Sequence, residues 1–364
     1  MDMTEKSVYI HIPFCKKICS YCDFCKFIYN STWVDKYLNA LKKEIEDRYL
    51  DNPIKTIYIG GGTPSALNTK ELNKLFRIIK IFKKTDDYEF TFECNLNDIN
   101  EELISVLVKN GVNRISIGIE SFNEKNLRFL NRTANFKEAV QKVSICKDLG
   151  INNINVDLIY ALPKESIFTL KKDLKFVKKL NITHVSTYSL MIEDHTMLKY
   201  RDIKPISEDL DYKMYKKICR KLKYYGFKHY EISNFAKEGY ESKHNLVYWN
   251  NEEYYGFGLG ASGYIEGVRY DNTKSLTEYL NGNIILNKEI LSEKDIMDYE
   301  IMLGLRKTNG INAKAFYDKY HVNIQTQYKI EELLKEKDLI YKNGNIFINP
   351  DKLYIMNEIL VKLI

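Results

Sequence analysis

Four cysteines lie within eleven residues near the N-terminus, at Cys15, Cys19, Cys22 and Cys25. The first three are spaced by four and then three residues, on a segment that follows a predicted strand over residues 8–12. Such a loop can place three thiolates around one face of an iron–sulfur cubane and leave one iron open to a small molecule. Zinc is the rival metal, but a structural zinc site usually needs a second cysteine pair, and no CxxC partner follows.

The other cysteines have no comparable spacing. Cys94, Cys146 and Cys219 are scattered, and an odd total of seven makes a poor disulfide framework. We expect these three to fill the core as small hydrophobic residues. We also expect Cys25 to be a thiol that binds no metal.

A longer motif surrounds the cysteines. Residues 9–14, YIHIPF, precede Cys15, and Asp23-Phe24 follows Cys22. Together with the CxxxCxxC spacing, this stretch resembles the radical S-adenosylmethionine (SAM) superfamily, and within it the HemW/HemN branch of haem chaperones and oxygen-independent coproporphyrinogen III oxidases. The resemblance extends to near Asn272. It implies that Cys15, Cys19 and Cys22 hold a [4Fe–4S] cluster, whose open iron binds SAM and whose electron cleaves it to a 5′-deoxyadenosyl radical.

Polar residues stand where successive predicted strands end. Gly60-Gly61-Gly62-Thr63 follows the second strand, where glycine lets the backbone approach a ligand closely, although the Gly-Lys-Ser/Thr of a nucleotide P-loop is missing. Each charged residue at a later strand end is, by itself, more typical of a paired or solvated charge. The resemblance implies that SAM is contacted by residues of the glycine turn, by the charged residues that follow the later strands, and by two tyrosines. These residues are Tyr9, Tyr21, Gly61, Gly62, Thr63, Glu93, Glu120, Arg132 and Asp157. Relatives commonly carry Gln where Glu120 stands, so this chain keeps an acceptor there and loses an amide donor.

A second motif, HNLVYW, covers residues 244–249. Histidine is a common axial ligand of haem iron, and tyrosine and tryptophan offer flat apolar surface to a porphyrin. By residue type alone, His244 is more typical of a hydrogen-bonded structural histidine. The stretch resembles the HNxxYW motif that the family associates with haem, which implies haem contacts at His244, Tyr248 and Trp249.

These residues need a scaffold that brings strand ends together. Six predicted strands alternate with helices over the first 200 residues, and this pattern fits either a doubly wound sheet or an incomplete barrel. The resemblance favours an α/β fold with a partial (β/α)6 TIM-like barrel of the radical SAM type. We predict this core over residues 1–200, a haem-side or substrate-side extension over 201–290, and a small winged-helix-like domain over 291–364, with a hairpin turning at Asn343-Gly344. The first long helix is expected to open with a capping box at Thr32–Asp35 and to bury Trp33.

Composition limits the choice of partners. The 364 residues include 55 Lys+Arg and 49 Asp+Glu, a net charge of +6, which does not require a nucleic acid. No apolar run is long enough for a membrane span, and no signal peptide is evident, so we expect a cytoplasmic protein.

The motifs favour a haem chaperone that binds haem and passes it to an acceptor protein. The alternative is an oxygen-independent coproporphyrinogen III oxidase that decarboxylates the propionates of its porphyrinogen, so whether the chain is an enzyme stays open. Either function implies an electron donor such as flavodoxin or ferredoxin. A plain ferredoxin-like carrier does not explain the polar strand ends, and nucleic-acid binding by the C-terminal module lacks a basic stripe.

Overall fold

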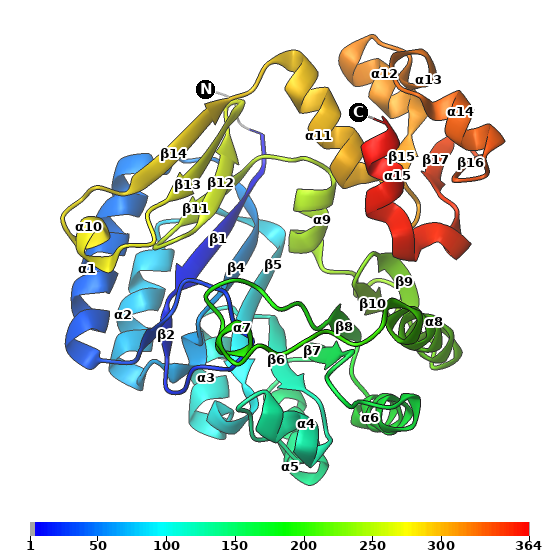
Figure 1. Cartoon of the computed structure of the whole chain (residues 1–364). Coiled ribbons are helices and arrows are strands. Elements are labelled where there is room, and N and C mark those ends of the chain that lie inside the picture. The colour runs from blue at the N-terminus through cyan, green and yellow to red at the C-terminus, as the bar shows by residue number, and fades with distance from the viewer. Residues whose placement is uncertain (1–3, 364) are drawn as a thin grey trace.

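Six parallel strands form the centre of the main sheet and lie side by side in chain order (Figure 1). The structure is a computed structural model that describes residues 4–363. A doubly wound sheet reverses its strand order at a switch point, whereas here each new strand extends the same edge. The predicted incomplete parallel barrel is therefore confirmed. Its strands are β1 (Lys6–Ile12), β4 (Ile54–Gly61), β5 (Lys84–Asn95), β6 (Arg114–Glu120), β7 (Asn153–Tyr160) and β8 (His184–Ser189).

Helices cover the outer face of these strands. When each right-handed crossover adds the next strand to the same edge, all the connecting helices lie on one side of the sheet. Figure 1 shows this arrangement. The long helices are α1 (Ser31–Arg48), α2 (Thr69–Ile79), α3 (Glu101–Lys109), α5 (Phe136–Asp148), α6 (Ile167–Leu180) and α8 (Glu208–Tyr224), and the short ones are α4 (Glu124–Phe129) and α7 (Met197–Tyr200).

Side chains alternate between the two faces of the central strands. Val8, Ile10 and Ile12 of β1 are fully buried in one hydrophobic cluster with Leu38 and Leu41 of α1. The opposite face of the strands carries polar side chains and lines the inside of the barrel. These inward positions include Tyr9, His11, Tyr58, Thr91, Glu93, Arg114, Ser116, Asn155, Asp157, His184 and Ser186. The barrel interior is therefore a polar space, which the site described below uses.

The segment predicted as an extension adds strands to both edges of the barrel sheet. On one edge, β10 (Asn234–Ala236) pairs antiparallel with β8 and is followed by β9 (Lys228–Glu231). On the other edge, β11 (Tyr254–Phe257) pairs parallel with β1, and β12 (Ser262–Ile265), β13 (Val268–Asn272) and β14 (Ile285–Ile290) follow. Helices α9 (Lys243–Trp249) and α10 (Leu276–Leu280) lie between these strands in the chain. The predicted boundaries at 200 and 290 stay predictions.

The last seventy residues build a second hydrophobic cluster, which includes Ile301, Phe316 and Ile346. A three-stranded sheet contains the predicted hairpin, turning at Asn343-Gly344. The prediction that this domain is winged-helix-like stays a prediction. The elements of the domain are α11 (Glu293–Gly304), β15 (Ile311–Asn312), α12 (Ala313–Tyr320), α13 (Ile324–Gln327), α14 (Ile330–Lys335), β16 (Leu339–Lys342), β17 (Asn345–Ile348), the 3₁₀ turn η3 (Pro350–Ile355) and α15 (Met356–Leu363).

The start of α1 differs from the prediction. Asn30 is the N-cap, and its side chain accepts a hydrogen bond from the Trp33 amide, so Thr32 lies inside the first turn. Trp33 is 44% exposed and does not join the buried stripe. The buried face of α1 includes Val34, Tyr37, Leu38 and Leu41.

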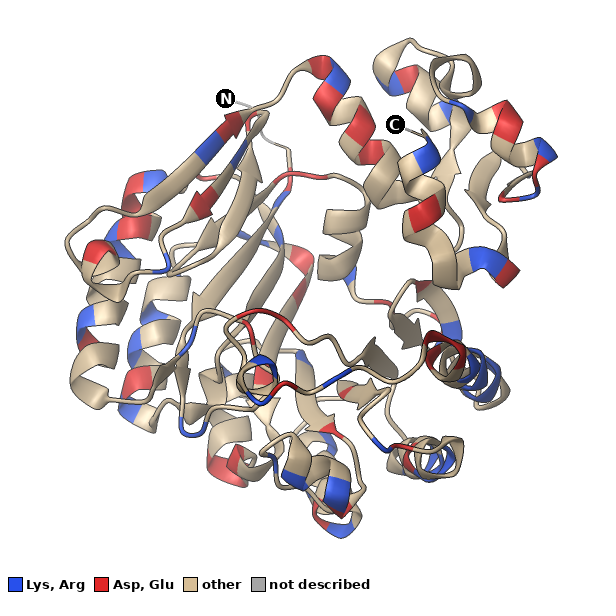
Figure 2. Cartoon of the chain, in the orientation of Figure 1, with Lys and Arg blue, Asp and Glu red and all other residues tan. Residues whose placement is uncertain are grey.

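Charged residues are spread over the helices that surround the sheet and over the C-terminal elements, and they also occur on edge strands such as β14 (Figure 2). Within residues 4–363, no helix is both long and apolar enough to cross a membrane.

Candidate functional site

The cysteine loop begins and ends on two short paired strands, β2 (Phe14–Cys15) and β3 (Phe27–Ile28). The Phe27 amide donates to the Pro13 carbonyl at 2.6 Å, and the Tyr29 amide donates to the Cys15 carbonyl at 2.9 Å. These two bonds close the loop into a ring beyond the carboxyl end of β1.

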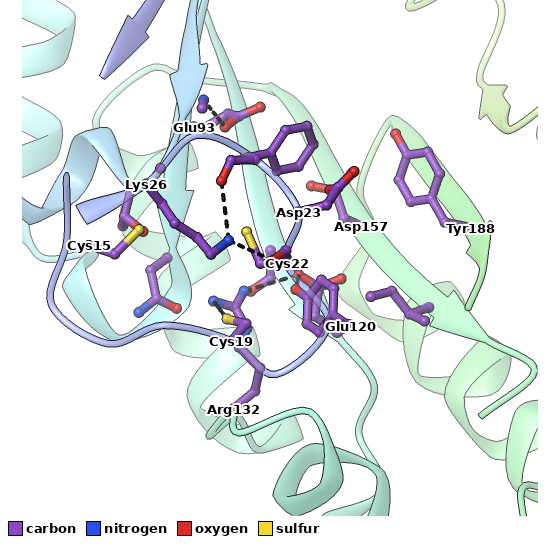
Figure 3. Close-up of a pocket in the computed structure, with 18 of the residues that line it drawn as sticks. Cys15, Cys19, Cys22, Asp23, Lys26, Glu93, Glu120, Arg132, Asp157 and Tyr188 are labelled. Atoms are coloured by element: carbon purple, nitrogen blue, oxygen red, sulfur yellow. Dashed lines mark hydrogen bonds and ion pairs between the residues drawn. The ribbon is translucent and has the colours of Figure 1, made fainter. Parts of the chain in front are cut away.

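The first three cysteines of the loop face one cavity of ≈ 310 Å³, which opens at the carboxyl ends of the strands (Figure 3). Thr63 Oγ1 donates to Cys15 Sγ at 3.3 Å, and Arg132 Nη1 lies 3.7 Å from Cys19 Sγ. Burial raises the pKa of the Cys22 thiol to about 11, and it also raises the pKa of Cys15 and Cys19. Without a metal these groups are therefore thiols, and metal binding must release their protons.

The arrangement of the three thiols fits a cluster better than a single ion. Zinc needs all of its ligands at about 2.0–2.3 Å from one point. Among residues 4–363, no group of three or more His, Cys, Asp or Glu side chains could hold one metal ion in that way. A cubane instead takes its cysteines on separate irons, which suits three sulfurs spread around one cavity.

Cys25 lies outside this cavity. Its Sγ is 3.7 Å from the carbonyl oxygen of Lys274, and its own carbonyl is 2.7 Å from His11 Nε2. Of the two lysines in the motif, Lys17 lines the cavity, whereas Lys16 pairs with Asp98 at 2.8 Å. Two cations lie next to cluster cysteines. Arg132, which sequence reasoning assigned to SAM alone, lies beside Cys19, and Lys26 Nζ donates to the Cys22 carbonyl at 2.6 Å.

The triple-glycine turn packs directly against the cysteine loop. The amides of Gly62 and Thr63 donate to the carbonyls of Ile12 and Phe14, both at 2.9 Å. A Cβ atom on Gly62 would lie 2.8 Å from the Ile12 carbonyl oxygen, which is backbone and has little freedom to move. Glycine at this position therefore lets β4 approach the first cysteine.

Glu93 links this turn to the end of β5. Its carboxylate accepts hydrogen bonds from Tyr58 Oη at 2.7 Å and from the Gly61 amide at 3.1 Å. Burial raises the pKa of Glu93 to about 7. The group is therefore placed to gain a full negative charge when a cation enters the cavity.

Glu120, Arg132 and Tyr21 form the next part of the wall. Glu120 Oε1 accepts from Tyr21 Oη at 2.8 Å and from Arg132 Nη2 at 3.1 Å. Glu120 has a positive φ of 68°, a conformation that costs a non-glycine residue energy and is frequent at functional sites. A side chain at Gly118 would collide with Arg132, whose Nη2 donates to the Gly118 carbonyl at 2.6 Å.

Asp157 completes the acidic lining, and a residue that sequence reasoning missed positions it. Asp157 accepts from Asn155 Nδ2 at 2.9 Å and from Ser116 Oγ at 3.0 Å. Asn155 Oδ1 lies 2.6 Å from His184 Nδ1, while Tyr230 Oη lies 2.8 Å from His184 Nε2. The sequence could have indicated Asn155, because residues two apart on a strand face the same side and Asn155 therefore shares the inner face of β7 with Asp157.

Tyr9 is the predicted SAM residue that does not line the cysteine cavity. It lines a neighbouring cavity of ≈ 300 Å³ that shares Phe24, Gly61 and Glu93 with the cysteine cavity. Its hydroxyl is 3.0 Å from His11 Nδ1. All the other predicted SAM residues line the cavity that the three cysteines face.

The predicted haem residues lie on α9, which packs into the inner face of the sheet. His244 is 1% exposed and stacks on Tyr58, with ring centroids 5.1 Å apart. Its Nδ1 lies 2.7 Å from Thr56 Oγ1, and its Nε2 lies 2.8 Å from Tyr248 Oη. Tyr248 lines the same cavity as Tyr9, whereas Trp249 lies outside both cavities, with Arg306 over its ring. The haem roles of these three residues stay predictions.

An incomplete parallel barrel with three thiols at its carboxyl rim defines the radical SAM class. Residues 9–177 match the radical SAM superfamily. The "Heme chaperone HemW" of Lactococcus lactis is 39% identical over 97% of this chain and 95% of its own length, and that of Bacillus subtilis is 37% identical over 97% and 98%. The chain therefore belongs to the radical SAM superfamily and to its HemW/HemN branch.

A solved structure has a similar fold. Coproporphyrinogen III oxidase (HemN) from Escherichia coli superimposes with a TM-score of 0.85 at 21% identity, covering 98% of this chain and 89% of that one. Membership of the superfamily implies a [4Fe–4S] cluster and SAM as cofactors.

Proposed function

We propose that this chain is a haem chaperone, which binds haem and passes it to an acceptor protein. Support comes from relatives named "Heme chaperone HemW" that align with nearly the whole chain, including the C-terminal elements. The observation that carries the cofactor part of the proposal is the shared cavity of Cys15, Cys19 and Cys22 with the strand-end residues Glu93 and Asp157.

The three thiols would hold the [4Fe–4S] cluster, which supplies single electrons and an open iron for SAM. Gly61, Gly62 and Thr63 would bring backbone groups close to SAM. Glu93, Glu120 and Asp157 would accept hydrogen bonds from its ammonium and hydroxyl groups, or offset its positive charge. Arg132 would hold Glu120 in place, and Tyr21 would fix the same carboxylate from the loop.

Haem binding and transfer can be measured directly. The full chain, reconstituted anaerobically with iron and sulfide, is titrated with haem and then mixed with apomyoglobin as a model acceptor. The proposal expects a saturable haem complex and transfer of the haem to the apoprotein. No binding, or binding without transfer, would contradict the chaperone function.

A parallel assay tests the oxidase alternative. The reconstituted chain is incubated with coproporphyrinogen III, SAM and a reductant under anaerobic conditions. The chaperone proposal expects no decarboxylated product. Formation of that product together with 5′-deoxyadenosine would establish the oxidase instead.

A further inference from the structure

A cavity of ≈ 950 Å³ lies between α8, β9 and η3, on the outside of the barrel. It shares no lining residue with the cysteine cavity of ≈ 310 Å³ or with the neighbouring cavity of ≈ 300 Å³ that Tyr9 lines. Pockets that bind small molecules and cofactors range from about 300 to 1,000 Å³. This third cavity therefore has the volume for a large cofactor, and it is separate from the cavity in which the cluster and SAM would lie.

One wall of the cavity is aromatic and joins the two hydrophobic clusters of the chain. Tyr212 and Tyr215 of α8 line it, and their ring centroids lie 5.1 and 5.5 Å from that of Tyr354 in η3. Tyr215 packs against both hydrophobic clusters. The buried residues Phe227 and Leu353 also line the cavity. Flat rings that are held by packing offer a surface suited to a planar apolar ligand.

The rim of the same cavity is basic, and Figure 2 shows Lys and Arg along α8. Its basic lining residues are Lys213, Lys216, Lys217, Arg220, Lys223 and Lys228. Its carboxylates are those of Glu238 and Asp351. Lys213 pairs with Asp209, whereas the other five cations form no ion pair within residues 4–363. Partial burial, together with neighbouring cations such as Arg220, lowers the pKa of Lys217. Uncompensated cations around an aromatic wall indicate an anionic ligand.

The HNLVYW motif offers less room for a macrocycle. His244 is 1% exposed, and its two ring nitrogens lie 2.7 Å from Thr56 Oγ1 and 2.8 Å from Tyr248 Oη. The cavity that His244 lines has a volume of ≈ 300 Å³. Ligation of iron by this imidazole would therefore break one of its two contacts inside the barrel.

We propose that haem binds in the cavity between α8, β9 and η3, with its macrocycle against Tyr212 and Tyr215 and its two propionates at the basic rim. The inference rests on the proposed haem-binding function and names the site. Haem combines a flat apolar ring with two carboxylates on one edge, which matches an aromatic wall bordered by cations. Charge-assisted hydrogen bonds from Lys216 and Arg220 would hold the carboxylates.

The test reverses two charges at the rim, in Lys216→Glu/Arg220→Glu. Both side chains are exposed, so the variant should keep its fold. The matched control is Lys178→Glu/Lys221→Glu, which makes the same change in net charge on α6 and α8 but outside the cavity. His244→Gln tests the histidine of the motif. Each full-length variant is reconstituted anaerobically and checked for cluster absorbance. It is then titrated with ferric haem and with haem dimethyl ester, which has no free carboxylate.

Reversal of the rim charges should raise the dissociation constant of ferric haem by about tenfold or more, while the control and His244→Gln should bind haem as the unaltered chain does. The ester should bind all of these proteins equally, and more weakly than haem binds the unaltered chain. Equal haem affinities for the rim variant and its control would overturn the assignment and leave the chaperone function standing. Loss of haem binding in His244→Gln alone, or an ester bound as tightly as haem, would do the same. Absence of haem binding by the unaltered chain would overturn both.

Discussion

The guanidinium of Arg132 joins Cys19 to Glu120. Nη1 lies 3.7 Å from the Cys19 sulfur, and Nη2 lies 3.1 Å from Glu120 Oε1. Arg132 follows α4 in the chain, so it reaches the cysteine loop from a different element. A cation beside one cysteine of an anionic cluster stabilises the reduced cluster, which carries one more negative charge.

Arg132→Gln should therefore lower the reduction potential of the cluster, by on the order of 100 mV. The measurement is a redox titration followed by electron paramagnetic resonance. Arg128→Gln is the control, because Arg128 forms only an exposed pair with Glu124. A potential that is equal in both variants would show that Arg132 does not act on the cluster.

Serine at Cys15, Cys19 or Cys22 should abolish the full cluster, because each thiolate would bind a separate iron and a hydroxyl is a weak substitute. Iron content and visible absorbance after anaerobic reconstitution measure the loss. Cys25→Ser should retain the cluster, since its sulfur lies against the Lys274 carbonyl. If Cys25→Ser lost the cluster and one of the other three kept it, the ligand set would have to be reassigned.

The stability of the metal-free chain should depend on the Glu93 carboxyl. Burial raises its pKa from 4.5 to about 7, so the folded chain holds this proton where the unfolded chain has released it. The free energy of unfolding should therefore fall as the pH rises from about 4.5 to about 7, and this one group accounts for at most about 3 kcal/mol.

Urea denaturation of the metal-free chain across that pH range measures the effect. Glu93→Gln should reduce the slope of stability against pH. Tyr58→Phe removes a hydrogen bond that favours the charged carboxylate, so it should extend the decline to higher pH. Parallel curves for the wild type and Glu93→Gln would exclude this carboxyl as the source.

Asn155 should be important for stability although it does not line the cavity. Its side chain bonds Ser116 and Asp157 through the amide nitrogen, and His184 and Ser186 through the oxygen. Asn155→Leu would remove these four buried hydrogen bonds and should cost roughly 2–4 kcal/mol. It should also weaken SAM binding, because Asp157 loses a contact that orients it.

Chemical denaturation and SAM titration of the reconstituted protein measure these two effects. Asn97→Ala is the control, because its side chain makes an exposed bond to Thr133, and it should change stability by no more than about 0.5 kcal/mol. Equal stabilities for Asn155→Leu and Asn97→Ala would refute the positioning role.

The sequence by itself determined the strands, most of the helices and the cysteine motif, because hydrophobic periodicity and residue spacing are local properties. The six central strands and the hairpin at Asn343-Gly344 followed from such patterns. The start of α1 was misplaced because Asn30 and Thr32 are both good cap residues, and only packing selects which face Trp33 occupies.

Only the tertiary structure decided which side chains meet. The sequence did not show that Tyr9, on the inner face of β1, lines a cavity with Glu93, His244 and Tyr248. It also gave no indication of the bonds made by Asn155 and Tyr58 or of the approach of Arg132 to Cys19. The physical reason is that hydrogen bonds across a barrel join residues far apart in the chain, and no local pattern records which of them will be neighbours.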